Sequence, residues 1–138
     1  MFTSQHLSLD EAQRAMEAVW SSLTNMDSPA AMAIVDADGT PTLCARQDGA
    51  PSRMLRRARA KAYTAARLAT NTVDFRDNAV KAANRTLDDW GDPEITSLQG
   101  GLAIWVDGRV VGAIAMSGNT TMRDEELAGI GLRAMELN

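Results

Sequence analysis

The chain has 138 residues, of which 45% are hydrophobic and 4% aromatic, and it carries a formal net charge of −4. This length suits a single domain, residues 1–138, with one core built mainly from small aliphatic residues and methionine. The acidic balance argues against nucleic acid as a partner, because nucleic-acid-binding surfaces are basic. No apolar stretch approaches the roughly 20 residues of a membrane-spanning helix, and a signal-peptide pattern is absent. We therefore expect a cytoplasmic protein that does not act at a membrane.

The first third of the chain predicts a helix followed by a hairpin. Ser8 to Glu11 has the pattern of a capping box, and helical spacing of apolar residues continues to about Asn25. Residues 31–35 are apolar on both faces, as expected of a strand covered on both sides. The dipeptide Asp38-Gly39 predicts a turn into a second, alternating strand that ends near Arg46.

Two helices are expected next. The first runs through "SRMLRRARAKAYTAARLAT", residues 52–70, and its stripe of alanines at positions 58, 62, 65 and 69 would let it lie close to a sheet. The second helix is predicted over residues 74–87, with Phe75, Ala79, Val80 and Ala83 on its inner face. The sequence "DDWGDP" ends it.

The C-terminal third predicts strands and a final helix. We expect a short strand at residues 95–98 and a hairpin of residues 102–106 and 109–116 around the turn Asp107-Gly108. A helix should begin at Thr120 or Thr121; Gly129 and Gly131 weaken it unless it packs closely on a neighbour. These elements predict an α+β fold with an antiparallel sheet of about five strands flanked by helices.

Six cations lie within residues 53–67, a segment that contains no acid. Arg53, Arg57, Lys61 and Thr64 share one helical face. Such a row could grip a carboxylate or a phosphate, or it could be a solvated face that pairs with acids elsewhere in the chain.

The small residues from Gly112 to Gly118 also have two interpretations. They could admit the last helix close to the sheet, or they could form the floor of a pocket for a flat ligand. We predict no metal site, because His6 and Cys44 are the single histidine and the single cysteine and lie far apart in sequence. His6 is interpreted as a surface residue and Cys44 as a core residue.

Several motifs together resemble one family. "AIVDADG", "AKAYTAA", the pair Gly100-Gly101, "GRVVGAIAMSG" and "DEELAGIGL" are similar to the GlcG/HbpS-like family, the heme-degrading domain also found at the C-terminus of PduO-type corrinoid adenosyltransferases. The resemblance covers roughly residues 7–137. It implies a five-stranded antiparallel sheet flanked by helices in profilin-like layers, a homo-oligomer that is a dimer or larger, and heme as the ligand of some members.

Three functional hypotheses follow. The first is a small-ligand-binding protein that holds heme or another flat anionic ligand. Its predicted contact residues are Arg46, Arg57, Lys61, Thr64, Gly100, Gly101 and Ser117. Because no histidine lies beside the motifs, an iron ligand would come from Tyr63, Met116, Thr64 or Cys44, or no side chain would bind the iron strongly.

The second hypothesis is a cofactor-independent enzyme of isomerase or lyase type that acts on a small carboxylate or cyclic metabolite. Its candidate acid–base groups are Lys61 and Tyr63. The third hypothesis is an assembly or accessory protein without a ligand site. The sequence leaves these alternatives open.

Overall fold

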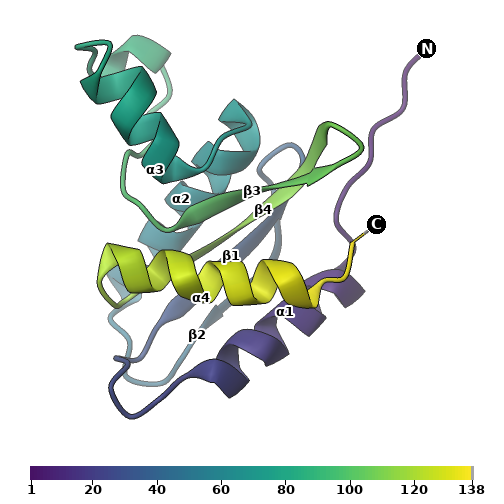
Figure 1. Ribbon diagram of the computed structural model, residues 1–138, viewed down its shortest axis with the longest axis vertical. Helices are drawn as coiled ribbons and strands as arrows, with labels where there is room; N and C mark the ends of the chain where they lie inside the picture. The colour runs from purple at the N-terminus through teal and green to yellow at the C-terminus, as the bar shows by residue number, and fades with distance from the viewer. Residues whose placement is uncertain (138) are drawn as a thin grey trace.

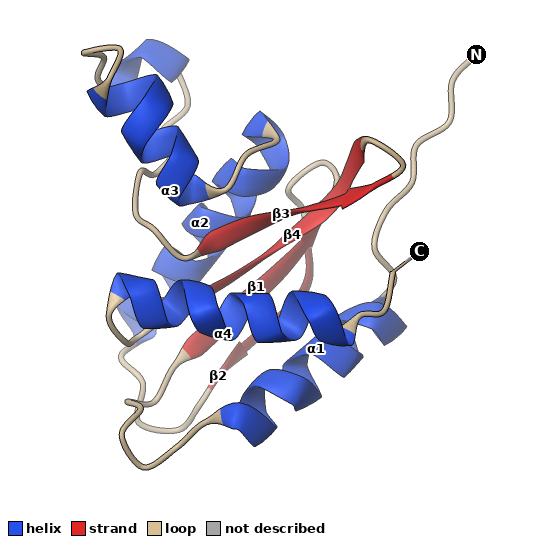
Figure 2. Cartoon of the chain, viewed as in Figure 1, coloured by secondary structure: helices blue, strands red, loops and turns tan. Residues whose placement is uncertain are grey.

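The computed structural model describes residues 1–137. Within them, four strands form an antiparallel sheet in the order β2-β1-β4-β3, and helices cover both faces (Figures 1 and 2). The strands are β1 (Ala31–Asp36), β2 (Pro41–Arg46), β3 (Gly101–Val106) and β4 (Arg109–Ser117). The main helices are α1 (Leu9–Ser22), α2 (Ser52–Leu68) and α4 (Thr121–Ala134). The predicted α+β fold with an antiparallel sheet is therefore confirmed.

The sheet separates two layers of core. Helices α1 and α4 cover one face, on which the strands carry larger side chains such as Met32, Ile34 and Ile114. Helix α2 covers the other face, where strand residues including Ala33 and Ala113 meet the helix alanines. The predicted stripe accounts for this close approach: its alanines at 58, 62 and 65 are buried, while the alanine at 69 is the exposed left-handed cap of α2.

The predicted fifth strand at residues 95–98 is absent from the described chain, 1–137. The Thr96 N–H donates to Thr64 Oγ1 at 2.9 Å, so this segment is attached to α2 rather than to the sheet. The outer edge of β3 is occupied instead by side chains from the turn after α2. Asn71 Oδ1 accepts the Ala103 N–H and Thr72 Oγ1 accepts the Gly101 N–H, both at 3.0 Å. These bonds use the donors to which another strand would pair.

The second predicted helix is shorter than expected and begins earlier. It starts as α3 (Thr72–Asp74), continues as the π-helical segment Phe75–Lys81, and is followed by the 3₁₀ turn Leu87–Trp90. Trp90 packs edge-on against Phe75, with 4.8 Å between the ring centroids. This segment projects from the layers in Figure 1, which explains why its outer half, including the predicted inner residue Ala83, is exposed.

Two single-residue interpretations meet the structure differently. His6 is exposed, as predicted. Cys44 is also exposed, so its assignment to the core is wrong. The reason is its place on β2: this strand forms an edge of the sheet, and α2 packs mainly over the inner strands.

Glycines on β4 and α4 serve close packing. A Cβ at Gly112 would overlap the Val35 carbonyl oxygen and the Leu7 side chain, and one at Gly131 would lie 2.6 Å from Ile114 Cδ1. The last helix therefore packs tightly on the sheet at Gly131, as the sequence suggested. Among residues 1–137, no helix combines the length and apolar character needed to cross a bilayer.

Candidate functional site

A cavity of about 420 Å³ opens between the N-terminal half of α2, the end of β4 and the start of α4. Its volume falls in the range of roughly 300–1,000 Å³ that is usual for small-molecule sites. We call it the Lys61 cavity. Its helix and strand walls are formed by Arg53, Met54, Arg57, Lys61, Ser117 and Asp124, and loop residues including Ser28, Pro29, Gly118 and Asn119 close it.

A buried ion pair forms one wall of this cavity. Lys61 Nζ lies 3.2 Å from Asp124 Oδ2 and donates to the Met116 carbonyl oxygen at 2.8 Å. Both charged side chains are only 2% exposed. Burial lowers the pKa of Lys61 and raises the pKa of Asp124, while the attraction between the two groups opposes both shifts. The two groups can therefore exchange a proton more readily than an exposed pair.

The start of α4 holds Asp124 in place. Thr120 caps the helix by accepting the Arg123 N–H at 3.2 Å, and the Asn119 N–H donates to Asp124 Oδ1 at 3.1 Å. Asp124 lies in the first turn, where the helix dipole favours an anion. Its carboxylate is thus positioned before any ligand is considered.

The double glycine makes room for Lys61. Gly100 has φ +132°, and a Cβ there would lie 2.8 Å from Lys61 Nζ. A Cβ at Gly101 would lie 2.6 Å from the Lys61 carbonyl oxygen. These two residues of the predicted site therefore lie beneath the lysine and admit α2 to the sheet, whereas Ser117 and Gly118 line the cavity itself.

Two arginines of the predicted cationic row lie at the cavity. Arg53 and Arg57 are exposed and sit one turn apart on α2. Within residues 1–137, neither forms an ion pair with a carboxylate. The interpretation that this row pairs with acids elsewhere in the protein therefore does not describe these two residues.

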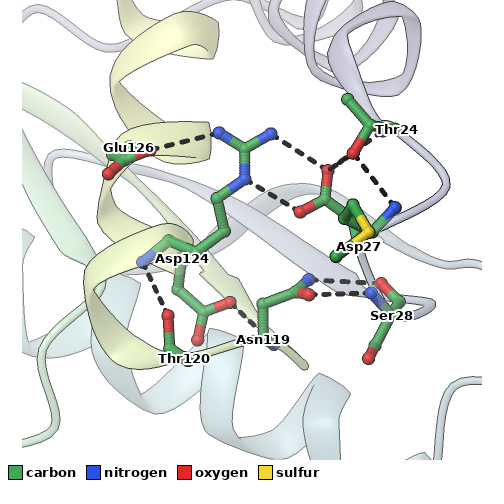
Figure 3. A network of polar contacts seen from close by, with 9 residues as sticks. Thr24, Asp27, Ser28, Asn119, Thr120, Asp124 and Glu126 are labelled. Carbon is green, nitrogen blue, oxygen red and sulfur yellow. Dashed lines mark hydrogen bonds and ion pairs between the residues drawn. The ribbon is translucent and has the colours of Figure 1, made fainter.

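The loop of residues 24–29 is clamped to the start of α4 (Figure 3). Arg123 donates from Nε and Nη2 to the two oxygens of Asp27 at 2.9 and 3.0 Å, and this guanidinium lowers the pKa of Asp27 to about 2. Asn119 pairs with the backbone of Ser28, accepting its N–H at 2.8 Å and donating to its carbonyl at 3.2 Å. These bonds fix one wall of the cavity.

Sequence reasoning missed Met54 as a site residue and Asp124 as the partner of Lys61. Met54 is 6% exposed, and its Sδ accepts a hydrogen bond from Ser117 Oγ at 3.6 Å. Its position seven residues before Lys61 places both on one helical face, a spacing that could have revealed it. Asp124 had no comparable signal, because it follows Lys61 by 63 residues.

Besides Gly100 and Gly101, two further predicted ligand contacts lie outside the cavity lining. Arg46 is exposed, donates to the Ala50 carbonyl at 2.6 Å and lines a neighbouring hollow that shares Ser28 and Pro29 with the Lys61 cavity. Thr64 is fully buried and accepts the Thr96 N–H. Both residues bond to segments next to the cavity and do not form its walls.

Tyr63 and Lys61 face different sides of α2, because residues two positions apart on a helix do not face each other. The Tyr63 hydroxyl donates to Asp92 Oδ2 at 2.6 Å, and this bond raises the pKa of Tyr63. Tyr63 lines a second cavity of about 600 Å³ with Arg56 and Arg59. The structure therefore does not bring the two predicted acid–base groups together.

The other predicted iron ligands are also placed away from the cavity. Met116 packs in the core under α1 and α4, and Cys44 is exposed on β2. A different group, His6, Asp36 and Asp38, brings its potential ligand atoms within 4.8 Å of one another. Two of these side chains bond to the local turn: His6 Nδ1 accepts the Ala37 N–H at 3.2 Å, and Asp36 Oδ1 accepts the Asp38 N–H at 2.9 Å.

Comparisons with known proteins agree on one family. The family model described as haem degrading protein HbpS-like matches residues 7–133. The Klebsiella pneumoniae protein ORFY is 25% identical, with a TM-score of 0.89 and coverage of 100% of this chain and 97% of that one. The PduOC protein, solved as a heme complex, is 25% identical, with a TM-score of 0.84 and coverage of 96% and 97%.

A longer relative is the corrinoid adenosyltransferase PduO of Salmonella typhimurium. It is 27% identical over 132 residues, which cover 95% of this chain. The match spans 39% of the length of PduO. The likeness therefore concerns one part of that enzyme.

Proposed function

This chain belongs to the HbpS-like family, and we propose that it is a small-ligand-binding member that holds a flat anionic ligand such as heme at the Lys61 cavity. The observation that carries this proposal is the pair of exposed arginines, Arg53 and Arg57, at a cavity of ligand size. The heme complex of the similar PduOC supports heme as the first ligand to test.

The charges of the cavity favour the arginines as the anion contacts. Lys61 and Asp124 neutralise each other and present no net charge to a ligand. Arg53 and Arg57 carry uncompensated charge, and a guanidinium can donate two parallel hydrogen bonds to one carboxylate. We assign the propionates of heme, or the carboxylate of another ligand, to these arginines, with Arg57 in the role that the sequence analysis gave it.

The chemistry of the walls fits a tetrapyrrole in two further respects. The cavity is open on one side, so a flat ligand larger than its volume can rest across the mouth. The Met54 thioether lines the cavity, and thioether sulfur is a known axial ligand of heme iron. In this proposal Met54 replaces the axial candidates taken from the sequence, because those side chains lie elsewhere.

A heme titration followed by the Soret band tests this function. Arg57→Ala should weaken binding by roughly 10- to 100-fold, the loss expected for a charged hydrogen bond. Arg56→Ala is the matched control, because Arg56 is an exposed neighbour on α2 that lines the other cavity. Equal affinities for the two variants, or a parent that takes up no heme at micromolar concentration, would contradict the proposal.

Self-association and a cytoplasmic location stay predictions. Trp105 is 52% exposed on the edge strand β3, and Met122 is 67% exposed on α4. These are two of the exposed apolar residues available to be covered by a second copy of the chain in the homo-oligomer that we propose.

A further inference from the structure

We propose that Lys61 is a nucleophilic amine that captures a small oxo acid as an imine inside the Lys61 cavity. The proposal rests on the proposed function in one respect, namely that the Lys61 cavity is a ligand site. It does not depend on heme.

The choice of lysine at this position is the first observation. The chain has fourteen lysines and arginines, of which only Lys61 and Lys81 are lysines. Arginine stays protonated in proteins, whereas a buried lysine can lose its proton and become a nucleophile. Lys61 lines the cavity and its side chain is 2% exposed. It is thus one of the only two basic side chains of the chain, lysines and arginines together, that can lose a proton and attack a carbonyl carbon.

The hydrogen bonds of Lys61 fit the uncharged amine that forms when Asp124 takes its proton. Nζ contacts two acceptors, the Met116 carbonyl at 2.8 Å and Asp124 Oδ2 at 3.2 Å. An ammonium has three N–H groups to satisfy, whereas a neutral amine has two and keeps a lone pair. Gly100 leaves the side of the nitrogen next to it free of a side chain. Burial also lowers the pKa of Lys61, which favours the same form.

Asp124 supplies the proton transfers that imine formation needs. Asp124, 3.2 Å from Nζ, first takes the ammonium proton and so frees the amine. The neutral Nζ attacks the carbonyl carbon, and as the C–N bond forms Asp124 passes this proton to the carbonyl oxygen. Asp124 then takes a second proton from the nitrogen, which gives the carbinolamine, and returns it to the departing hydroxyl. One water leaves and a C=N bond remains, so the step consumes no oxidant or reductant.

The cavity also selects the class of carbonyl compound. Arg53 and Arg57 favour a carboxylate on the ligand, and the volume of about 420 Å³ has room for a molecule of a few carbon atoms. The ligand class is therefore a small oxo acid rather than an uncharged aldehyde. Arg57 would hold the carboxylate while the carbonyl group reaches Lys61.

Reductive trapping tests the proposal on the intact protein. The parent is incubated with pyruvate and sodium cyanoborohydride, which reduces an imine to a stable secondary amine, and modified lysines are located by peptide mass spectrometry. Lys81, exposed on the projecting segment, is the internal control. We expect pyruvate to modify Lys61 in clear preference to Lys81. Arg57→Ala should lower the yield at Lys61 about tenfold, and Arg56→Ala should leave it unchanged.

Other outcomes would overturn the proposal. Equal modification of the two lysines, or none at Lys61, would show that Lys61 is not a nucleophile toward oxo acids. If acetaldehyde modifies Lys61 as fast as pyruvate does, in both the parent and Arg57→Ala, the ligand carboxylate has no role. The ligand would then not be an oxo acid. Heme uptake without trapping contradicts this inference alone, and trapping without heme uptake contradicts heme as the ligand, so the two failures are distinguishable.

Discussion

Replacing Lys61 by methionine removes the cation of the buried pair and keeps a long, flexible side chain that can fill the same space. Asp124, 2% exposed, would then be a buried carboxylate that retains the Asn119 N–H as a partner. Removing one member of a buried pair costs about 3–5 kcal/mol of unfolding free energy. The total unfolding free energy of a domain of this kind is about 5–15 kcal/mol, so we expect Lys61→Met to fold but to be much less stable than the parent.

A second substitution separates the charge effect from a packing effect. In Lys61→Met/Asp124→Asn, the uncompensated charge is gone while the amide oxygen can still accept the Asn119 N–H. We expect the double variant to recover about 1–3 kcal/mol relative to Lys61→Met, the usual size of coupling between charged groups in contact. Urea unfolding followed by tryptophan fluorescence measures the three free energies.

The pH dependence of the unfolding free energy is an independent test of this charge effect. Burial raises the pKa of Asp124 above 3.8, and loss of the Lys61 charge raises it further. The folded state then binds a proton more tightly than the unfolded state, so the unfolding free energy of Lys61→Met falls as the pH rises above 3.8. Its deficit relative to the parent should be smallest in acid. Equal losses for the single and double variants at every pH would refute the reasoning.

The remaining predictions concern the last helix and the loop that closes the cavity. Gly129→Ala should stabilise the protein by about 0.5–1 kcal/mol, because the new Cβ would meet a flexible side-chain end. Gly131→Ala should cost about 1–3 kcal/mol, because its Cβ would lie 2.6 Å from the buried Ile114 Cδ1; thermal melts that reverse this order would contradict the packing described here. The Arg123 guanidinium holds the pKa of Asp27 at about 2 against 3.8, so this carboxylate stabilises the fold above pH 3.8 and loses its effect as the pH falls toward about 2. Asp27→Asn should flatten the acid side of a plot of melting temperature against pH, and a slope equal to that of the parent would count against it.

Elements with strong local signals could be predicted from the sequence. The capping box at Ser8 is present with both of its reciprocal bonds, and the hairpins turn at the two predicted Asp-Gly pairs. These features depend on residues a few positions apart. The predicted fifth strand could join the sheet at β3 only if the outer edge of that strand were free to pair. The side chains of Asn71 and Thr72 occupy this edge, and nothing in their local sequence indicates that they do.

The sequence predicted the side of the site that α2 supplies, together with Ser117 on β4. Helical spacing placed Arg53, Arg57 and Lys61 on one face, and all three line the same cavity. Spacing could not show that the lysine is buried while the arginines are exposed, because burial of Lys61 depends on Asp124, 63 residues later. For the same reason Tyr63, close in sequence, belongs to another cavity.

Gly101 shows how close packing and the cavity can arise from one mechanism. Gly101 lets the backbone of α2 approach β3, since any side chain there would strike the Lys61 carbonyl oxygen. That approach brings Lys61 Nζ to the carbonyl oxygen of Met116 on β4 and to the carboxylate of Asp124 on α4. A bulkier residue at Gly101 would move α2 away from the sheet and lengthen both contacts. Close packing and the cavity are therefore not competing explanations, because the packing of α2 is what sets the reach of its lysine.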